Sequence, residues 1–211
     1  MRALLIGATG LVGRAFVSLA LEDAEVTKVI SLVRRASGVT HPKLEEHVVD
    51  FAKSETWPAL GADALFSSLG TTVKIAGSRE AQREIDYGIQ YRVAEAAAKA
   101  GVPTYVLVSS LGASATAMGA YSKMKGELDR DVQKLGFARV RILRPSMLVG
   151  DREVSRPGER IGETLLHAVS WVPGISKMRP IEGTTVAAAM LRAARDSETG
   201  VQILENAALF G

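Results

Sequence analysis

The amino-acid sequence predicts an α/β protein whose core is a doubly wound parallel sheet, with a small C-terminal extension on the substrate side. Two observations lead to this fold class. Short apolar runs alternate with helical patterns along the chain, and strands that alternate with helices pair in parallel through right-handed crossovers. The runs are continuously apolar rather than alternating, as strands covered on both faces of a sheet must be.

The individual elements follow from the apolar runs and from the glycine, proline and polar residues between them. Strands are expected at residues 3–6, 26–33, 62–69, 104–108 and 140–143, with one further strand ending at 47–49. Helices are expected at residues 11–21, 79–100, 121–135 and 184–195. Because the pattern weakens after Gly150, we predict one domain over residues 1–211, in which residues 150–211 supply the small substrate-side region.

The composition indicates a folded protein that acts on a small-molecule substrate. Of its 211 residues, 47% are apolar and 23% are charged, as in ordinary globular proteins. Cysteine is absent, which excludes disulfides, and the three histidines lack the spacing of metal ligands. The net charge of +3 is dispersed and no apolar run is long enough to span a bilayer, so neither a nucleic-acid nor a membrane partner is expected. We expect a cytoplasmic location and leave a homo-oligomer open.

A glycine-rich turn, GATGLVG at residues 7–13, joins the first predicted strand to the first predicted helix. This order is the signature of the Rossmann fold. Gly7 allows a tight turn, Gly10 lets the backbone approach a diphosphate, and Gly13 allows close packing of helix on strand. Backbone N–H groups at the helix start attract the phosphates. The predicted dinucleotide contacts here are Gly7, Thr9, Gly10, Leu11, Val12 and Gly13.

The end of the second strand selects the dinucleotide. An NAD site usually places a carboxylate there for the ribose 2′-hydroxyl, whereas this chain has Arg34 and Arg35. Guanidinium groups bind a 2′-phosphate, so NADP(H) is preferred and NAD(H) stays possible. Alternatively, both arginines are simply solvated. Asp50 and Phe51, after the third strand, are expected to flank the adenine, although Asp50 is equally suited to cap the helix that follows.

Tyr121 and Lys125 form a Tyr-x-x-x-Lys pair on a predicted helix, where positions i and i+4 share a face. An ammonium beside a phenol favours the phenolate, so Lys125 prepares Tyr121 to exchange a proton with a substrate oxygen. Ser109 and Ser110 end the fifth strand, where reacting groups of α/β proteins gather, and Ser110 is expected to hold that oxygen. Taken singly, a solvated lysine and a strand-end turn explain these residues equally well.

In this order, the glycine turn, the serine pair and the Tyr-x-x-x-Lys pair resemble the short-chain dehydrogenase/reductase superfamily. More narrowly, the chain is similar to the atypical branch that contains the Tat-interacting, metastasis-suppressor oxidoreductase. Besides residues 7–13, the matching segments are Val33-Arg34-Arg35, Val49-Asp50-Phe51, Leu69-Gly70-Thr71-Thr72, Val108-Ser109-Ser110, Lys125-Gly126-Glu127, Arg144-Pro145, Asp151-Arg152 and Ser155-Arg156-Pro157-Gly158-Glu159.

The resemblance implies a fold that binds NADPH, with Tyr121 and Lys125 in the catalytic positions and in contact with the cofactor. It also implies that three residues after the fourth strand line the ribose side of the cofactor and that two residues after the sixth strand lie near the nicotinamide. These residues are Leu69, Gly70 and Thr71, and Pro145 and Ser146.

Two departures from the superfamily pattern bear on activity. Only eleven positions separate Ser110 from Tyr121, which indicates a short loop and an open site. The asparagine that many members use to hold a relay water is not evident, and the corresponding helix offers Asp86 and Tyr87. The main hypothesis is an NADP(H)-dependent oxidoreductase that transfers hydride to or from a carbonyl or alcohol. The alternative is an NADPH-binding regulatory protein with little or no turnover.

Overall fold

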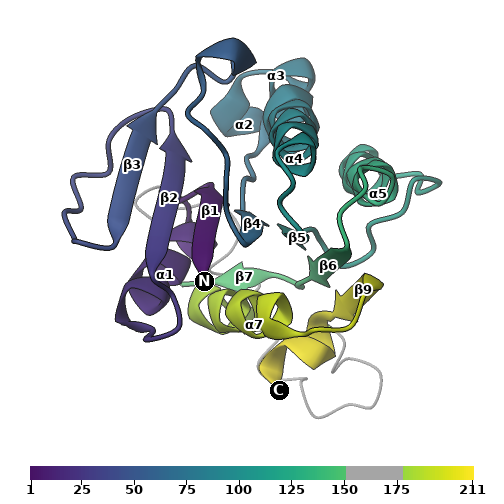
Figure 1. Ribbon diagram of the computed structural model, residues 1–211. Helices are drawn as coiled ribbons and strands as arrows, with labels where there is room; N and C mark the ends of the chain where they lie inside the picture. The colour runs from purple at the N-terminus through teal and green to yellow at the C-terminus, as the bar shows by residue number, and fades with distance from the viewer. Residues whose placement is uncertain (151–177) are drawn as a thin grey trace.

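The structure is a computed structural model that describes residues 1–150 and 178–211 (Figure 1). Seven parallel strands form one sheet in the order β3-β2-β1-β4-β5-β6-β9. The predicted Rossmann sheet is therefore confirmed. The strands are β1 Arg2–Ile6, β2 Lys28–Val33, β3 Leu44–Val48, β4 Ala64–Ser67, β5 Thr104–Val108, β6 Arg139–Arg144 and β9 Gly200–Glu205.

The strand order reverses at β1, which lies between β2 and β4. Ile6, the last residue of β1, is opposite Leu32 on one side and Ser67 on the other. The carboxyl ends of these strands meet there, and ligands of open α/β sheets bind in the crevice beside such a reversal. The glycine turn follows β1 directly, so the fold brings it to this point.

Helices cover both faces of the sheet (Figure 1). On one face, α1 (Leu11–Glu22) and α7 (Gly183–Arg195) pack against each other. Their side chains form one apolar core with the sheet, in which the Phe16 ring of α1 lies tilted against the Phe66 ring of β4 at 4.4 Å between centroids. On the other face, α4 (Gln90–Lys99) and α5 (Ala120–Val132) supply Val93 and Leu128 to a second core. Burial on both faces explains why the strand runs are continuously apolar.

The helix predicted at residues 79–100 is helical throughout but not uniform. It consists of α3 (Arg79–Arg83), a π-helical segment η2 (Glu84–Ile89) and α4. The short α2 (Val73–Ala76) precedes it. A π-helical segment adds a residue to the turn and is frequent at functional sites. Within this segment, Asp86 is fully buried.

The C-terminal part completes the main sheet, which the sequence did not predict. The predicted helix at 184–195 is α7, but β9 was missed because it is an edge strand in which Val201 and Ile203 are both more than 40% exposed. A pair of two-residue strands, β7 (Leu148–Val149) and β8 (Ile181–Glu182), and the 3-10 helix η4 (Asn206–Phe210) complete the description.

In the described residues, no helix combines the length and the apolar character that a bilayer crossing needs. The motif at residues 151–159, which contributed to the resemblance, lies outside the described residues.

Candidate active site

A cleft of about 610 Å³ crosses the carboxyl ends of the central strands. It brings together residues from both halves of the chain. Twelve of the predicted site residues line it: Gly7, Thr9, Gly10, Leu11, Val12, Arg34, Arg35, Leu69, Gly70, Thr71, Tyr121 and Lys125. A second hollow, of about 630 Å³, is lined by Ser110, Pro145 and Ser146 among others. The two share Thr71, Ser109, Tyr121 and Leu148, so they meet at Tyr121.

The glycine turn has the geometry that a diphosphate needs. Gly7 has a φ of +90°, and a Cβ on Gly13 would lie 2.0 Å from the carbonyl oxygen of Gly7. The turn is closed by the Gly10 N–H, which donates to the Gly7 carbonyl at 3.0 Å. Gly10 is the N-cap of α1, and no side chain caps the helix. The N–H groups of the first turn, at Leu11 and Val12, are therefore free of intrahelical partners at the wall of the cleft, and these residues fit a dinucleotide diphosphate.

Three arginines are among the residues that line this cleft. Arg34 and Arg35 are exposed at its wall, as a 2′-phosphate site requires. Arg14, which the sequence analysis missed, lines the cleft as well and donates to the Thr9 carbonyl at 3.2 Å. Its position directly after Gly13 could have predicted this place, because a side chain in the first turn of a helix points back over the preceding loop.

Asp50 and Phe51 do not line the cleft, which corrects the adenine contact predicted for them. Phe51 is 6% exposed and packs edge-on against Trp57 in the core on the α4 face. The Asp50 carboxylate accepts from the Ala52 N–H at 2.9 Å, and its carbonyl accepts from the Trp57 indole. Asp50 therefore caps the turn after β3, close to the alternative role. The Phe51 ring is buried because contact with other apolar side chains removes its surface from water.

Tyr121 and Lys125 share the face of α5 that the sequence predicted, but in different environments. Tyr121 is 43% exposed at the mouth, whereas Lys125 is 2% exposed one turn further in. Burial excludes the solvated-lysine alternative. The Lys125 Nζ lies 3.7 Å from Oδ1 of Asp86, whose other oxygen accepts the Thr71 N–H at 3.0 Å. Asp86 thus ties the catalytic helix to the loop after β4.

A second carboxylate lies one helical turn beyond Lys125. Arg144 donates to one oxygen of Asp129 from Nε at 3.1 Å and from Nη2 at 2.9 Å. Burial raises the pKa of the Asp129 carboxyl, while the Ser109 hydroxyl, Arg144 and Lys125 act in the opposite direction. Lys125 therefore stands between two buried acidic side chains.

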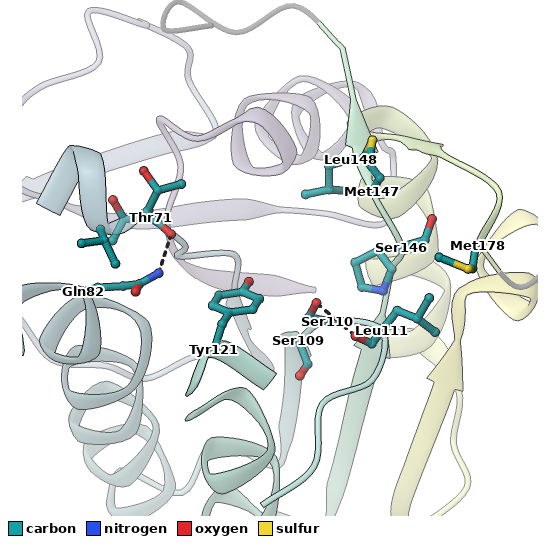
Figure 2. Close-up of a pocket in the computed structure, with 13 residues that line it drawn as sticks. Thr71, Gln82, Ser109, Ser110, Leu111, Tyr121, Ser146, Met147, Leu148 and Met178 are labelled. Carbon is teal, nitrogen blue, oxygen red and sulfur yellow. Dashed lines mark hydrogen bonds between the residues drawn. The ribbon is translucent and has the colours of Figure 1, made fainter. Parts of the chain in front are cut away.

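The two serines after β5 have different surroundings. Ser109 is 6% exposed and lies beside Asp129. Ser110 is more open, and its hydroxyl makes only a long contact of 3.4 Å to the Leu111 carbonyl. Figure 2 shows Tyr121 between Thr71 on one side and Ser110 on the other. Of the pair, Ser110 is the serine available to a substrate oxygen.

The segment after β6 is held by a residue that the sequence did not single out. Asn206, 1% exposed, accepts the Ser146 N–H at 2.9 Å and donates to the Arg179 carbonyl at 2.9 Å. It thereby fixes Ser146 and its neighbour Pro145 beside the hollow. Because 60 positions separate Asn206 from Ser146, no local pattern announces the contact. Across the described stretches, no three His, Asp or Glu side chains are grouped as metal ligands.

Comparison with known proteins adds a family. A family model described as NAD(P)H-binding matches residues 7–197. "Protein FMP52-1, mitochondrial" from Scheffersomyces stipitis is 37% identical over 93% of this chain and 89% of its own length. "Protein FMP52, mitochondrial" from Eremothecium gossypii is 41% identical over 75% of this chain and 71% of its own length.

Among solved structures, MoeE5 in complex with UDP-glucose and NAD aligns with a TM-score of 0.70 and 17% identity, covering 97% of this chain and 75% of that one. At this identity the match supports the Rossmann fold alone. The relatives' names contradict the cytoplasmic location that the sequence analysis predicted, and that prediction is wrong. The absence of cysteine and of a membrane-spanning run fits a cytoplasmic location but does not exclude another compartment.

Proposed function

We propose that this chain, which belongs to the NAD(P)H-binding family, is an NADP(H)-dependent oxidoreductase. Its reaction interconverts a carbonyl and an alcohol. One observation carries the proposal. Tyr121, one turn of α5 before the buried Lys125, lines both the cleft and the second hollow where they meet. A proton donor at that junction reaches a substrate in the hollow and a cofactor in the cleft. The proposal includes membership of the atypical short-chain dehydrogenase/reductase branch that the sequence resembles.

The preference for NADP(H) rests on charge. Arg14, Arg34 and Arg35 all line the cleft. Each guanidinium presents several N–H donors in a planar fork that suits phosphate oxygens. At the end of β2, where an NAD site usually places a carboxylate for the ribose 2′-hydroxyl, this chain has Arg34 and Arg35 instead. NAD(H) lacks the phosphate and gains nothing from the arginines, so it is the weaker ligand.

The reaction divides between the cofactor and the protein. A bound nicotinamide supplies or accepts the hydride. Tyr121 donates its hydroxyl proton to the carbonyl oxygen during reduction and takes it back during oxidation. Ser110 orients that oxygen by a hydrogen bond. Lys125 stabilises the negative charge that Tyr121 then carries.

Replacing Tyr121 with Phe tests the proposal. We expect a hundred- to ten-thousandfold loss of turnover, on the order of a general acid's contribution, with NADPH affinity unchanged. Turnover is followed by NADPH absorbance with a panel of aldehydes, ketones and quinones, and affinity by calorimetry. Tyr91→Phe is the matched control, because Tyr91 stacks on Tyr87 away from the cleft. Full activity of Tyr121→Phe contradicts the mechanism. Tight NADPH binding without turnover of any carbonyl supports the regulatory alternative.

Replacing Arg34 and Arg35 with Ala tests the cofactor preference. We expect the affinity for NADPH to fall about ten- to a hundredfold while that for NADH stays constant, since each charged hydrogen bond contributes about 1.5–3 kcal/mol. Calorimetric titration of both dinucleotides measures the ratio. Arg2→Ala, exposed at the opposite end of β1, serves as the control. An equal loss for both dinucleotides refutes a 2′-phosphate contact.

A further inference from the structure

The second hollow has a chemical character of its own. In the part of the chain that the structure describes, thirteen residues line it and none is Asp, Glu, Lys, Arg or His. A sugar nucleotide carries a diphosphate, which proteins bind with cations and backbone N–H groups at helix starts. The described residues of this wall include no cation. Its occupant is therefore best matched by an uncharged molecule.

Large apolar side chains that face solvent collect at the same hollow. Ten such side chains are exposed in the described residues, and four of them line it: Val73, Tyr121, Met147 and Met178. Their exposed fractions are 41%, 43%, 37% and 54%. Soluble proteins rarely gather exposed apolar side chains into one place without a ligand or partner to cover them. Methionine is flexible and polarisable, so it adapts to varied apolar shapes.

The polar groups of the hollow suit one oxygen atom. Gln82 donates to the Thr71 carbonyl at 3.2 Å, and the Ser146 hydroxyl donates to the Arg179 carbonyl. Those donors are already engaged within the protein. Figure 2 shows Tyr121 and Ser110 next to each other, with Thr71 and Gln82 on one side of them and Met147 and Met178 on the other. The hollow thus offers two neighbouring hydroxyls for one carbonyl oxygen and, on one side of them, an apolar wall for the rest of the molecule.

We propose that this hollow binds an uncharged carbonyl compound with an extended apolar body, its oxygen held by Tyr121 and Ser110 and its body resting on Met147 and Met178. The inference rests on the proposed function, whose site it uses. It names a substrate class that excludes sugar nucleotides such as the UDP-glucose bound to MoeE5. Burying one methylene contributes about 0.8 kcal/mol, or about fourfold in affinity.

A homologous series of aldehydes tests the inference in the full chain loaded with NADPH. We expect kcat/KM to rise about fifteenfold from butanal to hexanal, which differ by two methylenes, and glyceraldehyde to be a poor substrate. Met147→Lys places a charge on the apolar wall and should cancel the gain of hexanal over butanal. Met118→Lys is the matched control, because Met118 is fully exposed and does not line the hollow. Equal rates for butanal and hexanal, or a preference for glyceraldehyde, overturn the inference.

A binding measurement separates this inference from the reaction. Hexanol, which NADPH cannot reduce, is titrated into the NADPH-loaded protein, with UDP-glucose as the competing candidate. Binding of hexanol that Met147→Lys abolishes supports the apolar hollow even where no aldehyde is turned over, in which case the proposed function fails alone. Absence of hexanol binding, or binding of UDP-glucose in its place, overturns the inference while NADPH binding and turnover remain separately measurable.

Discussion

The two ends of the cleft are built in different ways. The cofactor end is mostly backbone from one strand–turn–helix unit, residues 7–13, in which Gly7 and Gly13 approach each other within one turn. The catalytic end is a set of side chains from separate elements. Tyr121 and Lys125 come from α5, Asp86 from η2, and Ser110 from the segment after β5. Substitutions in the backbone turn and substitutions among the side chains from separate elements should therefore affect NADPH binding and turnover differently.

The largest effect is expected at the cofactor end. In Gly13→Val, the Cβ would lie 2.0 Å from the Gly7 carbonyl oxygen, so the turn and α1 must separate. We expect destabilisation of about 3 kcal/mol, as for overpacking, and at least a hundredfold loss of NADPH affinity. Urea unfolding and calorimetry measure the two. Gly61→Ala is the control, since a Cβ there meets nothing within 4 Å. Normal NADPH binding by Gly13→Val would contradict the proposal that the backbone of residues 7–13 binds the diphosphate.

A smaller effect is expected at the catalytic end from Asp86→Asn. The amide oxygen can still accept the Thr71 N–H, but the charge beside Lys125 is lost. We expect kcat to fall about tenfold through misplacement of Lys125, with the KM for NADPH changed much less. Steady-state kinetics gives this split, and Asp86→Ala should lose more because it removes the hydrogen bond as well. Equal kcat for Asp and Asn shows that Asp86 only stabilises the fold.

The smallest effect is expected away from both ends, at Asp131. The Arg130 guanidinium, with Lys134 and the Tyr87 hydroxyl, holds the pKa of the Asp131 carboxyl well below its ordinary value. A carboxyl with a lowered pKa stabilises the folded state above its unfolded pKa, and this contribution is lost as pH falls through the folded one. Asp131→Asn should cost about 1 kcal/mol at pH 7 and progressively less below about pH 4. Urea unfolding across that range checks it; a difference independent of pH rules it out.

The sequence analysis succeeded where structure is local. Five of the six predicted strands lie on the observed ones within two residues at each end, and the third was placed only at its end. The glycine turn, the Arg pair and the Tyr-x-x-x-Lys spacing were each readable because their residues are neighbours in one turn or helix face. Phe51 was misplaced for the opposite reason. Its ring could contact either a ligand or Trp57, and only the tertiary packing determines which contact it makes.

The contacts that complete the candidate site were not readable. Asp86 meets Lys125 across 39 positions of sequence, and Asn206 meets Ser146 across 60. Arg14 was readable in principle from its place after Gly13 and was passed over. The edge strand β9 lacked the continuous apolar run of the inner strands, because solvent covers part of it.

By itself, the sequence determined the sheet, the glycine turn and the helix face that Tyr121 shares with Lys125, since each depends on periodicity and backbone freedom within a few residues. Only the tertiary structure decided that Lys125 is buried between Asp86 and Asp129, that Ser110 rather than Ser109 is open, and that an uncharged hollow meets the cofactor cleft at Tyr121. The reason is physical: burial and charge depend on which distant elements pack together, and no local pattern specifies that.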